Sequence, residues 1–318
     1  MRQNTTSPVR FLSCEPRVYQ YDQIGFVLLT SRETPLTPLA FISEAGRVCA
    51  IFDEPTQDSG NISYGVETAD KRYFIKTAGS PTVTRPFLPC QARVDLLRNV
   101  VRLHERVRHA ALVPLRNVVE SPDGPLLVFD WVSGELLGAP FESRSDPSTA
   151  YVRFRRLPVQ RILSALDEVI DLHRELASWG YVAVDFYDGS LMYDFEASRV
   201  HAIDLDSYRL GPFVNRMGRM FGSTRFMAPE EFEFGAEINE RTTVHALGRT
   251  VFELLTDPLT ALFRGPTLLR VLAERASARL PAARYRSVAE FASAWREARS
   301  MCSETSEDES PCTSEMRL

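Results

Sequence analysis

The sequence is poor in cysteine, and its cysteines form no pattern. It contains five, with no C-x-x-C pair among them: Cys14, Cys49, Cys90, Cys302 and Cys312. A disulfide framework or a structural zinc site would place cysteines in a regular, even set. The odd and scattered set argues against both and fits the reducing environment of the cytosol, so we expect a cytoplasmic protein.

The sequence also lacks an excess of basic residues and any long apolar run. Lys and Arg total 37 against 42 Asp and Glu, which gives a net charge of −5. Without a strong positive field, neither nucleic acid nor an anionic membrane is an expected partner. No apolar run approaches the roughly 20 residues of a membrane-spanning helix. Residues 1–16 are polar, and we expect no secretory signal there.

Apolar residues make up 44% of the 318 positions, which is enough to bury one large core or two smaller ones. In the first half, apolar and β-branched runs between turn-forming residues predict strands over 48–52, 62–67, 72–76, 112–119 and 125–132. A helix is expected between the third and fourth of these strands, because Val94, Leu97 and Val101 recur there at helical spacing.

The second half is predicted to be mainly helical. Apolar residues from Ile162 to Leu176 recur with the period of an amphipathic helix, and His173 lies on this stripe, which predicts a packed core histidine. The other expected elements are strands over 191–193 and 200–203 and helices over 244–255 and 288–298. A β-rich half followed by a helical half predicts an α+β protein with two lobes.

Two features of the first half favour phosphate binding. Gly60 and Gly65, with Ser63 between them, lie among strand-like runs, and glycines let a backbone approach a phosphate closely. A plain turn would contain such glycines as well. Lys76 lies inside an apolar strand, where its ammonium group must meet an anion or reach water. An outward-pointing lysine on an edge strand is the alternative.

A cluster of carboxylates in the second half is a stronger signal. Asp185 and Asp188 precede one short predicted strand, and Asp204 and Asp206 end the next one. Carboxylates held at the mouth of a hairpin repel one another unless a cation joins them, and oxygen ligands of this kind suit Mg²⁺. A solvated loop of turn-forming residues is the alternative, which the apolar residues on both sides disfavour.

The most specific pattern is G-S-T-R-F-M-A-P-E at residues 222–230. With this segment the chain resembles the eukaryotic-like (bacterial-type) serine/threonine protein kinases, whose signatures occur here in order and at normal spacing over residues 57–297. The resemblance implies a bilobal protein-kinase fold, with a small β-rich N-lobe and a larger helical C-lobe that bind ATP between them.

The resemblance places the N-lobe at residues 57–132 and the C-lobe at 133–298. Residues 1–56 are then an N-terminal extension without a family assignment. Residues 299–318 are acidic, rich in Ser and Thr and poor in large aliphatics, so we expect them to be a disordered tail.

The nucleotide-binding roles follow from the resemblance. The hairpin from Gly60 to Gly65, with Ser63, would cover the phosphates of ATP. Lys76 would bind the α- and β-phosphates, and Asp95, 19 positions later, would be the helix partner of this lysine. Residues 126–132 resemble the hinge that binds adenine through backbone groups, and the remaining expected nucleotide-binding residues are Asp130, Val132 and Glu135.

The resemblance also implies the catalytic and metal-binding roles. Asp185 would orient the substrate hydroxyl and accept its proton, and Asp204 would hold Mg²⁺ with Ser190 or Asp188 assisting. Mn²⁺ is a possible replacement for Mg²⁺. Glu230 would pair with Arg284.

Several departures from the family pattern fall at the chemistry. Ala183 and Val184 replace the His and Arg before the catalytic Asp, and loss of that Arg predicts that loop phosphorylation is not needed for ordering. Tyr187 replaces a lysine that would stabilise the γ-phosphate. Ser190 replaces a metal-binding Asn, and Thr243 replaces the Asp that anchors the catalytic loop.

Three functions are therefore open. The chain is an active protein kinase that uses ATP on an unknown protein substrate, a pseudokinase that binds ATP as a scaffold or switch, or a small-molecule kinase on the same fold. The complete 222–230 segment favours the first two, because it resembles the loop that docks protein substrates. The loss of the lysine at Tyr187 is tolerated in small-molecule relatives as well.

Overall fold

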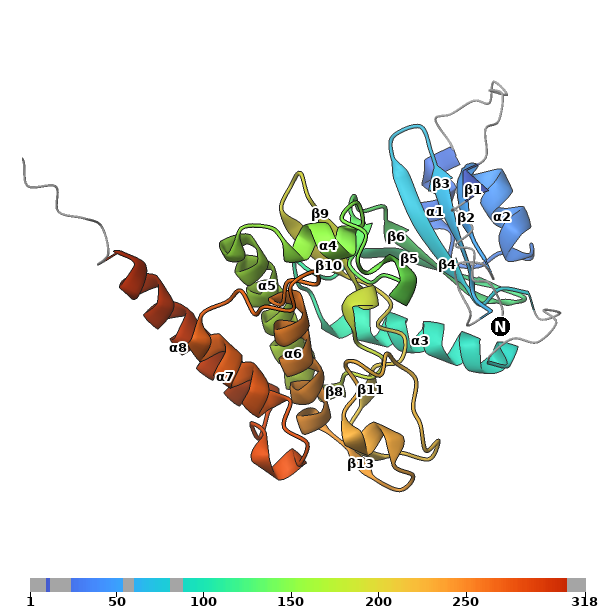
Figure 1. Ribbon diagram of the computed structural model, residues 1–318. Helices are drawn as coiled ribbons and strands as arrows, with labels where there is room; N and C mark the ends of the chain where they lie inside the picture. The colour runs from blue at the N-terminus through green and yellow to red at the C-terminus, as the bar shows by residue number, and fades with distance from the viewer. Residues whose placement is uncertain (1–9, 12–23, 54–59, 81–87, 308–318) are drawn as a thin grey trace, which may run out of the picture. The chain divides into compact units, whose positions relative to one another are not determined.

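The structure is a computed structural model that describes residues 10–11, 24–53, 60–80 and 88–307. The chain forms two compact units: unit 1 contains residues 1–108 and 112–133, and unit 2 contains residues 109–111 and 134–318. Figure 1 shows that the strands of the large sheet belong to unit 1 and that most long helices belong to unit 2. The protein is therefore α+β, as the sequence predicts.

An antiparallel sheet forms the centre of unit 1. Within the described residues it has six strands in the order β1-β2-β3-β4-β6-β5. The strands are β1 (Arg10–Phe11), β2 (Arg47–Phe52), β3 (Ile62–Glu67), β4 (Arg72–Thr77), β5 (Leu115–Ser121) and β6 (Gly124–Asp130). All five strands expected in this half are present, and β3 has the expected bounds.

Two helices that the sequence analysis left unassigned cover one face of this sheet. They are α1 (Ile24–Thr30) and α2 (Pro38–Ala45). Leu28, Phe41 and Ile42 from these helices are buried in one cluster with strand residues such as Val66 and Ile75. Part of the segment predicted as an N-terminal extension therefore supplies the core of unit 1.

The opposite face of the sheet contacts the predicted helix α3 (Cys90–Arg106). The ring of His104 in α3 lies 5.4 Å from the ring of Phe129 in β6, measured between centroids. Side chains alternate along a strand, so Leu127 shares this face with Phe129. Lys76 pairs directly with Leu127 across β4 and β6, and cross-strand partners point to the same side. Lys76 therefore lies on the α3 face.

Unit 2 is built around a buried central helix. Its α-helices, among the described residues, are α4 (Ala150–Arg155), α5 (Val159–Ser178), α6 (Glu240–Leu254), α7 (Thr267–Ala276) and α8 (Val288–Glu307). Helix α6 is buried on most sides, including Thr243, Leu247 and Val251. A Cβ added to Gly248 would lie 2.6 Å from the Cβ of Ala276, so glycine is required for the close packing of α6 on α7.

The expected amphipathic helix is confirmed as α5. Its predicted stripe is buried, and His173 on that stripe is 1% exposed. The helix α8 extends through Glu307, so the boundary of the disordered tail predicted at residue 299 falls inside this helix.

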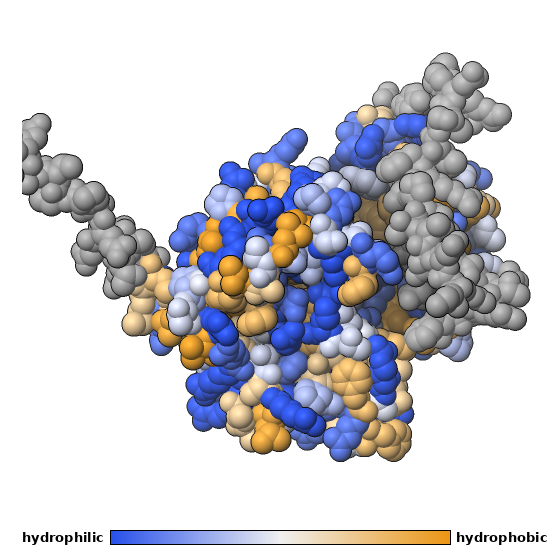
Figure 2. All heavy atoms as spheres, in the orientation of Figure 1, coloured by the Kyte–Doolittle hydropathy of each residue, from blue (hydrophilic) through white to orange (hydrophobic). Residues whose placement is uncertain are grey.

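On the face shown in Figure 2, hydrophobic and hydrophilic residues of unit 2 are interspersed. None of the helices in the described ranges has the length and apolar content to cross a membrane.

Short strands complete unit 2 and support its loops. They are β7 (Glu135–Leu136), β8 (Tyr181–Val182), β9 (Leu191–Asp194), β10 (Arg199–Ala202), β11 (Arg209–Leu210), β12 (Phe213–Val214) and β13 (Glu237–Ile238). Strands β9 and β10 form the hairpin expected from the sequence, and β7 pairs with the other edge of β9. The segments on which the predicted carboxylates lie therefore flank this hairpin.

Candidate active site

Lys76 is a buried cation on a central strand. It is 8% exposed, and β4 lies between β3 and β6 in the sheet. The alternative of an outward lysine on an edge strand is therefore wrong. Ser63 is its direct partner on β3 and is fully buried. A cation in this position needs anionic or polar partners to offset its desolvation.

The glycine-rich segment before β3 is held by an arginine that the sequence analysis missed. Arg93 of α3, 1% exposed, donates to the carbonyl oxygens of Gly60, Ala78 and Ser80. Arg93 lies at helical spacing from Leu97, and this spacing is a signal that could have identified it. Gly65 is required by packing, because a Cβ there would lie 2.8 Å from Cζ3 of Trp131.

Asp95 does not occupy the position predicted for it. It lies on the exposed side of α3, and its carboxylate accepts a hydrogen bond of 2.9 Å from Nε2 of Gln91 in the same helix. The buried face of α3 is formed instead by residues such as Arg93 and Leu97. Because Lys76 is buried on the sheet and Asp95 is exposed to solvent, the predicted pairing of these two residues is wrong.

The predicted hinge residues have structural partners of their own. The Asp130 carboxylate accepts bonds from Arg116 Nε at 2.8 Å and from Lys71 Nζ at 3.1 Å. Burial alone would raise the pKa of Asp130, but these two cations hold it below its usual value. Val132 follows the end of β6 and is half-buried. Glu135, in unit 2, is exposed and pairs with Arg153 Nη1 at 2.7 Å.

In unit 2, Asp185 and Asp204 share an unusual backbone conformation. Among the described residues, four non-glycine residues have positive φ, and two of them are Asp185 at 61° and Asp204 at 60°. This left-handed conformation is sparsely populated for residues with a Cβ, although Asp tolerates it better than most. Such strain is found where the surrounding structure imposes it, often at functional sites.

Hydrogen bonds connect the loops that contain these two aspartates. Ser190 Oγ donates to the carbonyl oxygen of Asp185 at 3.2 Å, and the backbone N–H of Ile203 donates to the carbonyl oxygen of Ser190 at 2.9 Å. Ser190 thus joins the Asp185 loop to the residue that precedes Asp204. Thr243 of α6 also fixes this loop, because its Oγ1 accepts a bond of 2.9 Å from the N–H of Ala183.

Ala183 and Val184, which directly precede Asp185, are core residues. Both are 3% exposed. Val184 packs in an apolar cluster with Met220, Met227 and Ile238. The cluster joins the Asp185 loop to residues before and within the 222–230 segment.

The 222–230 segment approaches the backbone of Asp185. Gly222 has a φ of 130°, and a Cβ placed on it would lie 3.6 Å from the Cα of Asp185. The same Cβ would lie 3.1 Å from Cγ of Met227. Gly222 therefore allows both the backbone turn and the close approach, and it places Ser223 next to the Asp185 loop.

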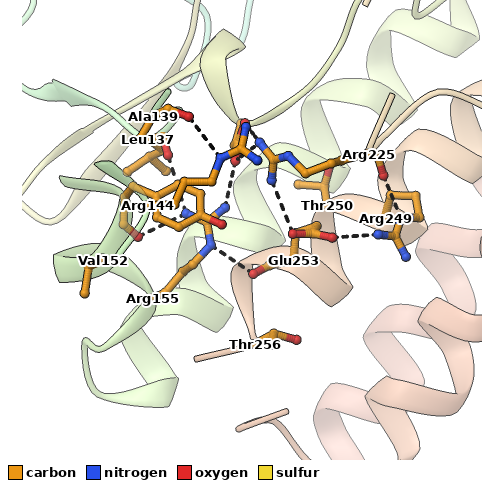
Figure 3. Close-up of polar contacts among 12 residues, drawn as sticks. Leu137, Ala139, Arg144, Val152, Arg155, Arg225, Arg249, Thr250, Glu253 and Thr256 are labelled. Carbon is orange, nitrogen blue, oxygen red and sulfur yellow. Dashed lines mark hydrogen bonds and ion pairs between the residues drawn. The ribbon is translucent and has the colours of Figure 1, made fainter. Parts of the chain in front are cut away.

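Asp188 is not available as a metal ligand. It is completely buried, and its carboxylate accepts bonds from Arg155 Nη2 at 2.8 Å and from Arg225 Nη2 at 2.9 Å. Figure 3 shows Arg155, Arg225 and Arg249 arranged around Glu253 of α6. Both oxygens of Asp188 serve this ion-pair network, so the predicted metal-binding role of Asp188 is wrong.

The network fixes the 222–230 segment to the Asp185 loop. Arg225 Nη1 also contacts Glu253 Oε2 at 3.3 Å, and Arg249 Nε donates to the carbonyl oxygen of Arg225 at 2.8 Å. Asp188 lies three residues after Asp185. The side chain and the backbone of Arg225 are thus both held.

The predicted pair of Glu230 and Arg284 is confirmed. Arg284 donates from Nη1 to Oε1 at 2.6 Å and from Nη2 to Oε2 at 2.9 Å, in a buried bidentate arrangement. Thr242 Oγ1 donates to Oε1 of Glu230 at 3.0 Å. Burial alone would raise the pKa of Glu230, but the bonds and charge of Arg284 hold it below the usual value.

We expect Arg284→Ala to lower the free energy of unfolding by about 3–5 kcal/mol, because it leaves the Glu230 carboxylate buried and unpaired. The measurement is the denaturant midpoint at pH 7. Arg286→Ala is a matched control: Arg286 pairs with Glu290 at the surface and is 80% exposed, so its loss should change stability by about 0–1 kcal/mol. Equal midpoints for the two variants would contradict a stabilising role for the buried pair.

Buried titratable groups predict how the stability of unit 2 depends on pH. Burial and the charges of Glu230 and Asp185 raise the pKa of Glu231 to about 8. Burial lowers the pKa of His173 and of His245 to about 4. Below pH 6.5 the two histidines bind protons in the unfolded chain and stay unprotonated in the folded protein, so lowering the pH favours unfolding. Above pH 4.5 Glu231 keeps its proton in the folded protein and loses it in the unfolded chain, so raising the pH favours unfolding.

Stability should therefore be highest near pH 6.5. Towards pH 4.5 the effect of the two histidines exceeds that of Glu231, so the free energy of unfolding falls. Towards pH 8, Glu231 is the one of these three groups whose protonation still differs between the folded and unfolded states. The free energy of unfolding then falls by up to about 1.4 kcal/mol per pH unit. Denaturant titrations at each pH measure this profile. Glu231→Gln should remove the fall above pH 6.5, and an unchanged fall in that variant would count against a protonated Glu231.

Within the described residues, no three His, Cys, Asp or Glu side chains gather into a metal site. With Asp188 engaged by arginines, Asp204 and Ser190 are the predicted metal-binding residues that remain. A magnesium ion bound with a nucleotide needs only one or two protein carboxylates, because phosphates and waters complete its coordination. A carboxylate and a hydroxyl are both oxygen ligands of the kind that such an ion takes.

The chain matches no known protein-family model, and no curated protein is similar to it in sequence.

Proposed function

We propose that the protein is a divergent protein kinase that transfers the γ-phosphoryl group of ATP to a Ser or Thr hydroxyl of a protein substrate. One observation supports this best: Asp185 and Asp204 both have strained left-handed backbones, and Ser190 connects their loops through hydrogen bonds. Two carboxylates fixed in this way suit one proton acceptor and one metal ligand. A bilobal protein-kinase fold is part of the proposal.

The residues would divide the chemistry as follows. Bound Mg-ATP would supply the phosphoryl group and the metal that neutralises its charge. Lys76 would hold the α- and β-phosphates, and Asp204, with Ser190, would hold the metal. Asp185 would accept the proton of the substrate hydroxyl as its oxygen bonds to the γ-phosphorus and the bond to the ADP oxygen breaks.

The lysine content of the chain makes the nucleotide role directly testable. Lys71 and Lys76 are the only lysines in the sequence, and the other 35 of its 37 Lys and Arg residues are arginines. Lys71 is exposed and pairs with Asp130. A compact ammonium group suits a phosphate as a point charge, and retaining a lysine at the buried position supports a role for Lys76 that arginine does not fill.

A lysine-directed acylating analogue of ATP should therefore label Lys76 in preference to Lys71, and excess Mg-ATP should suppress the labelling of Lys76 alone. Mass spectrometry of the two lysine-containing peptides gives the ratio, with Lys71 as the internal control. Mg-ATP should also stabilise the wild type by about 2.7 kcal/mol at 100 times Kd, and Lys76→Ala should lose most of this shift. Equal labelling of both lysines, unaffected by Mg-ATP, would overturn the nucleotide role.

Phosphate transfer itself is tested by incubating the protein with labelled ATP and Mg²⁺ or Mn²⁺, with and without generic protein substrates. A pseudokinase is the second candidate, because Tyr187 stands where a γ-phosphate-stabilising lysine is expected. Labelling of Lys76 without any phosphate transfer would select the pseudokinase.

A further inference from the structure

The stretch from Ser207 to Pro229 has an unusual charge composition. It contains four arginines and no carboxylate, in a chain whose net charge is −5. The arginines are Arg209, Arg216, Arg219 and Arg225. A local positive field in an acidic protein needs a physical reason, because like charges close together repel one another.

Among the residues that the structure describes, Arg225 is the one of these four arginines whose charge is neutralised. Arg225 pairs with Asp188 and Glu253. The other three are exposed, and none of them forms an ion pair with any residue that the structure describes. Arg209 lies over the ring of Phe213 at 5.5 Å, and Arg219 donates only to the carbonyl oxygens of Met220 and Gly222. Their charges remain available to an anionic partner.

Two of these arginines, Arg209 and Arg219, lie close to the loop that contains Asp185. Arg219 Nη2 donates to the Gly222 carbonyl oxygen at 3.2 Å, and a Cβ on Gly222 would lie 3.6 Å from the Asp185 Cα. Arg209 is the β11 partner of Val182, which lies in the strand leading to Asp185. A peptide whose hydroxyl reached Asp185 would therefore have its flanking residues near Arg209 and Arg219. Arg216 is exposed and lies three residues before Arg219 in the chain. We call these three the basic surface.

We propose that the basic surface binds an acidic peptide segment around the acceptor hydroxyl, and that the C-terminal segment 303–318 of this chain is such a substrate. This proposal rests on the proposed kinase function. The segment, SETSEDESPCTSEMRL, contains five carboxylates, one arginine and six Ser or Thr residues. Three of the six, Ser303, Thr305 and Ser306, lie at the end of α8, and the other three follow this helix in the sequence. Its charge and its acceptor groups complement the basic surface and Asp185, so the expected reaction is phosphorylation of this segment by a protein of the same sequence.

The first experiment measures binding without catalysis. A fluorescent peptide of residues 303–318 is titrated with the full-length protein, without nucleotide, and anisotropy is recorded at low and at 0.5 M salt. Binding should weaken at least tenfold at the higher salt because the contacts are ionic. A peptide with Gln or Asn at every acidic position should bind at least tenfold more weakly. Equal affinity of the two peptides would overturn the proposal, and so would tighter binding of a single-stranded RNA of equal charge.

The second experiment measures transfer with the same two peptides. Arg209→Gln/Arg216→Gln should raise the KM for the acidic peptide about tenfold and leave kcat and the KM for the neutral peptide little changed. Neither arginine bonds to the Gly222 carbonyl, so this variant leaves that contact intact. Arg209→Lys/Arg216→Lys should restore the KM. The control Arg270→Gln/Arg286→Gln removes two exposed arginines elsewhere in unit 2.

The outcomes separate this proposal from the proposed function. If the protein phosphorylates acidic and neutral peptides equally, the kinase function stands and the basic surface is not a substrate site. If the acidic peptide binds selectively and no phosphate is transferred to any peptide, the kinase function fails, and with it the substrate role of segment 303–318. In wild-type protein incubated with ATP, mass spectrometry should find phosphate on residues 303–314, and its absence would overturn the substrate role.

Discussion

Asp185→Asn is expected to reduce phosphate transfer by about 10²–10⁴-fold while leaving ATP binding nearly unchanged. The variant removes the group that we assign to accept the proton of the substrate hydroxyl, and general base catalysis contributes about this factor. Asparagine keeps the size of the side chain and, like aspartate, tolerates the left-handed backbone found at this position. The loss should therefore be chemical, with the fold intact.

The assay is transfer of label from ATP to a protein or peptide acceptor, in parallel with the thermal shift on Mg-ATP. Asp146→Asn is the matched control, since Asp146 is an exposed carboxylate in the same unit, and it should retain wild-type transfer. We expect the wild-type rate to lie below the roughly 1–100 s⁻¹ of typical kinases, because Tyr187 supplies no cation. Equal background transfer by wild type and Asp185→Asn, with either Mg²⁺ or Mn²⁺, would show that Asp185 is not catalytic.

The regular elements could be predicted from the sequence because local patterns determine them. The strand β3 has the predicted bounds Ile62–Glu67, and the stripe from Ile162 to Leu176 is buried as α5. Alternation and helical periodicity arise from the geometry of one element and need no knowledge of its neighbours. The pair of Glu230 and Arg284 was also predictable, because each residue lies within a recognisable motif.

The errors concern residues whose partners come from distant parts of the chain. The interval of 19 residues from Lys76 predicts that Asp95 lies on the helix beside the sheet, and Asp95 does lie on α3. This helix buries Arg93 and Leu97 in the core, however, and leaves Asp95 exposed to solvent. Asp188 was grouped with other carboxylates because spacing does not show that Arg155 and Arg225 would bury it. Neither arginine is distinguishable in sequence from the many exposed arginines of this chain.

The helices α1 and α2 were missed for a different reason. The first has seven residues, and the second begins after Thr37, whose side chain makes no capping hydrogen bond. Isolated helices of this length are marginal in water. They exist because Leu28, Phe41 and Ile42 are buried against the sheet, and this is tertiary packing that a local pattern does not contain.

Asp188→Asn is expected to lower the free energy of unfolding of the protein by at least about 3–5 kcal/mol. Removing one partner of a buried ion pair typically has an effect of this size, because the remaining charge stays buried without compensation. Here one carboxylate serves two guanidinium groups, and the Arg155 side chain is only 1% exposed. The asparagine amide would also present N–H groups to donors that need acceptors.

The measurement is the denaturant midpoint with its slope, which separates a change in stability from a change in the unfolded state. Glu135→Gln is the matched control, because it removes a carboxylate that pairs with Arg153 at the surface, and it should change stability by about 0–1 kcal/mol.

The double variant Asp188→Leu/Arg155→Met replaces both charges of the buried pair by apolar groups of similar size. If the pair stabilises mainly by mutual compensation, this double variant should be more stable than Asp188→Asn. A metal ligand would behave in the opposite way: Asp188→Asn would keep the midpoint of the wild type and lose only the effect of Mg²⁺ or Mn²⁺ on ATP binding.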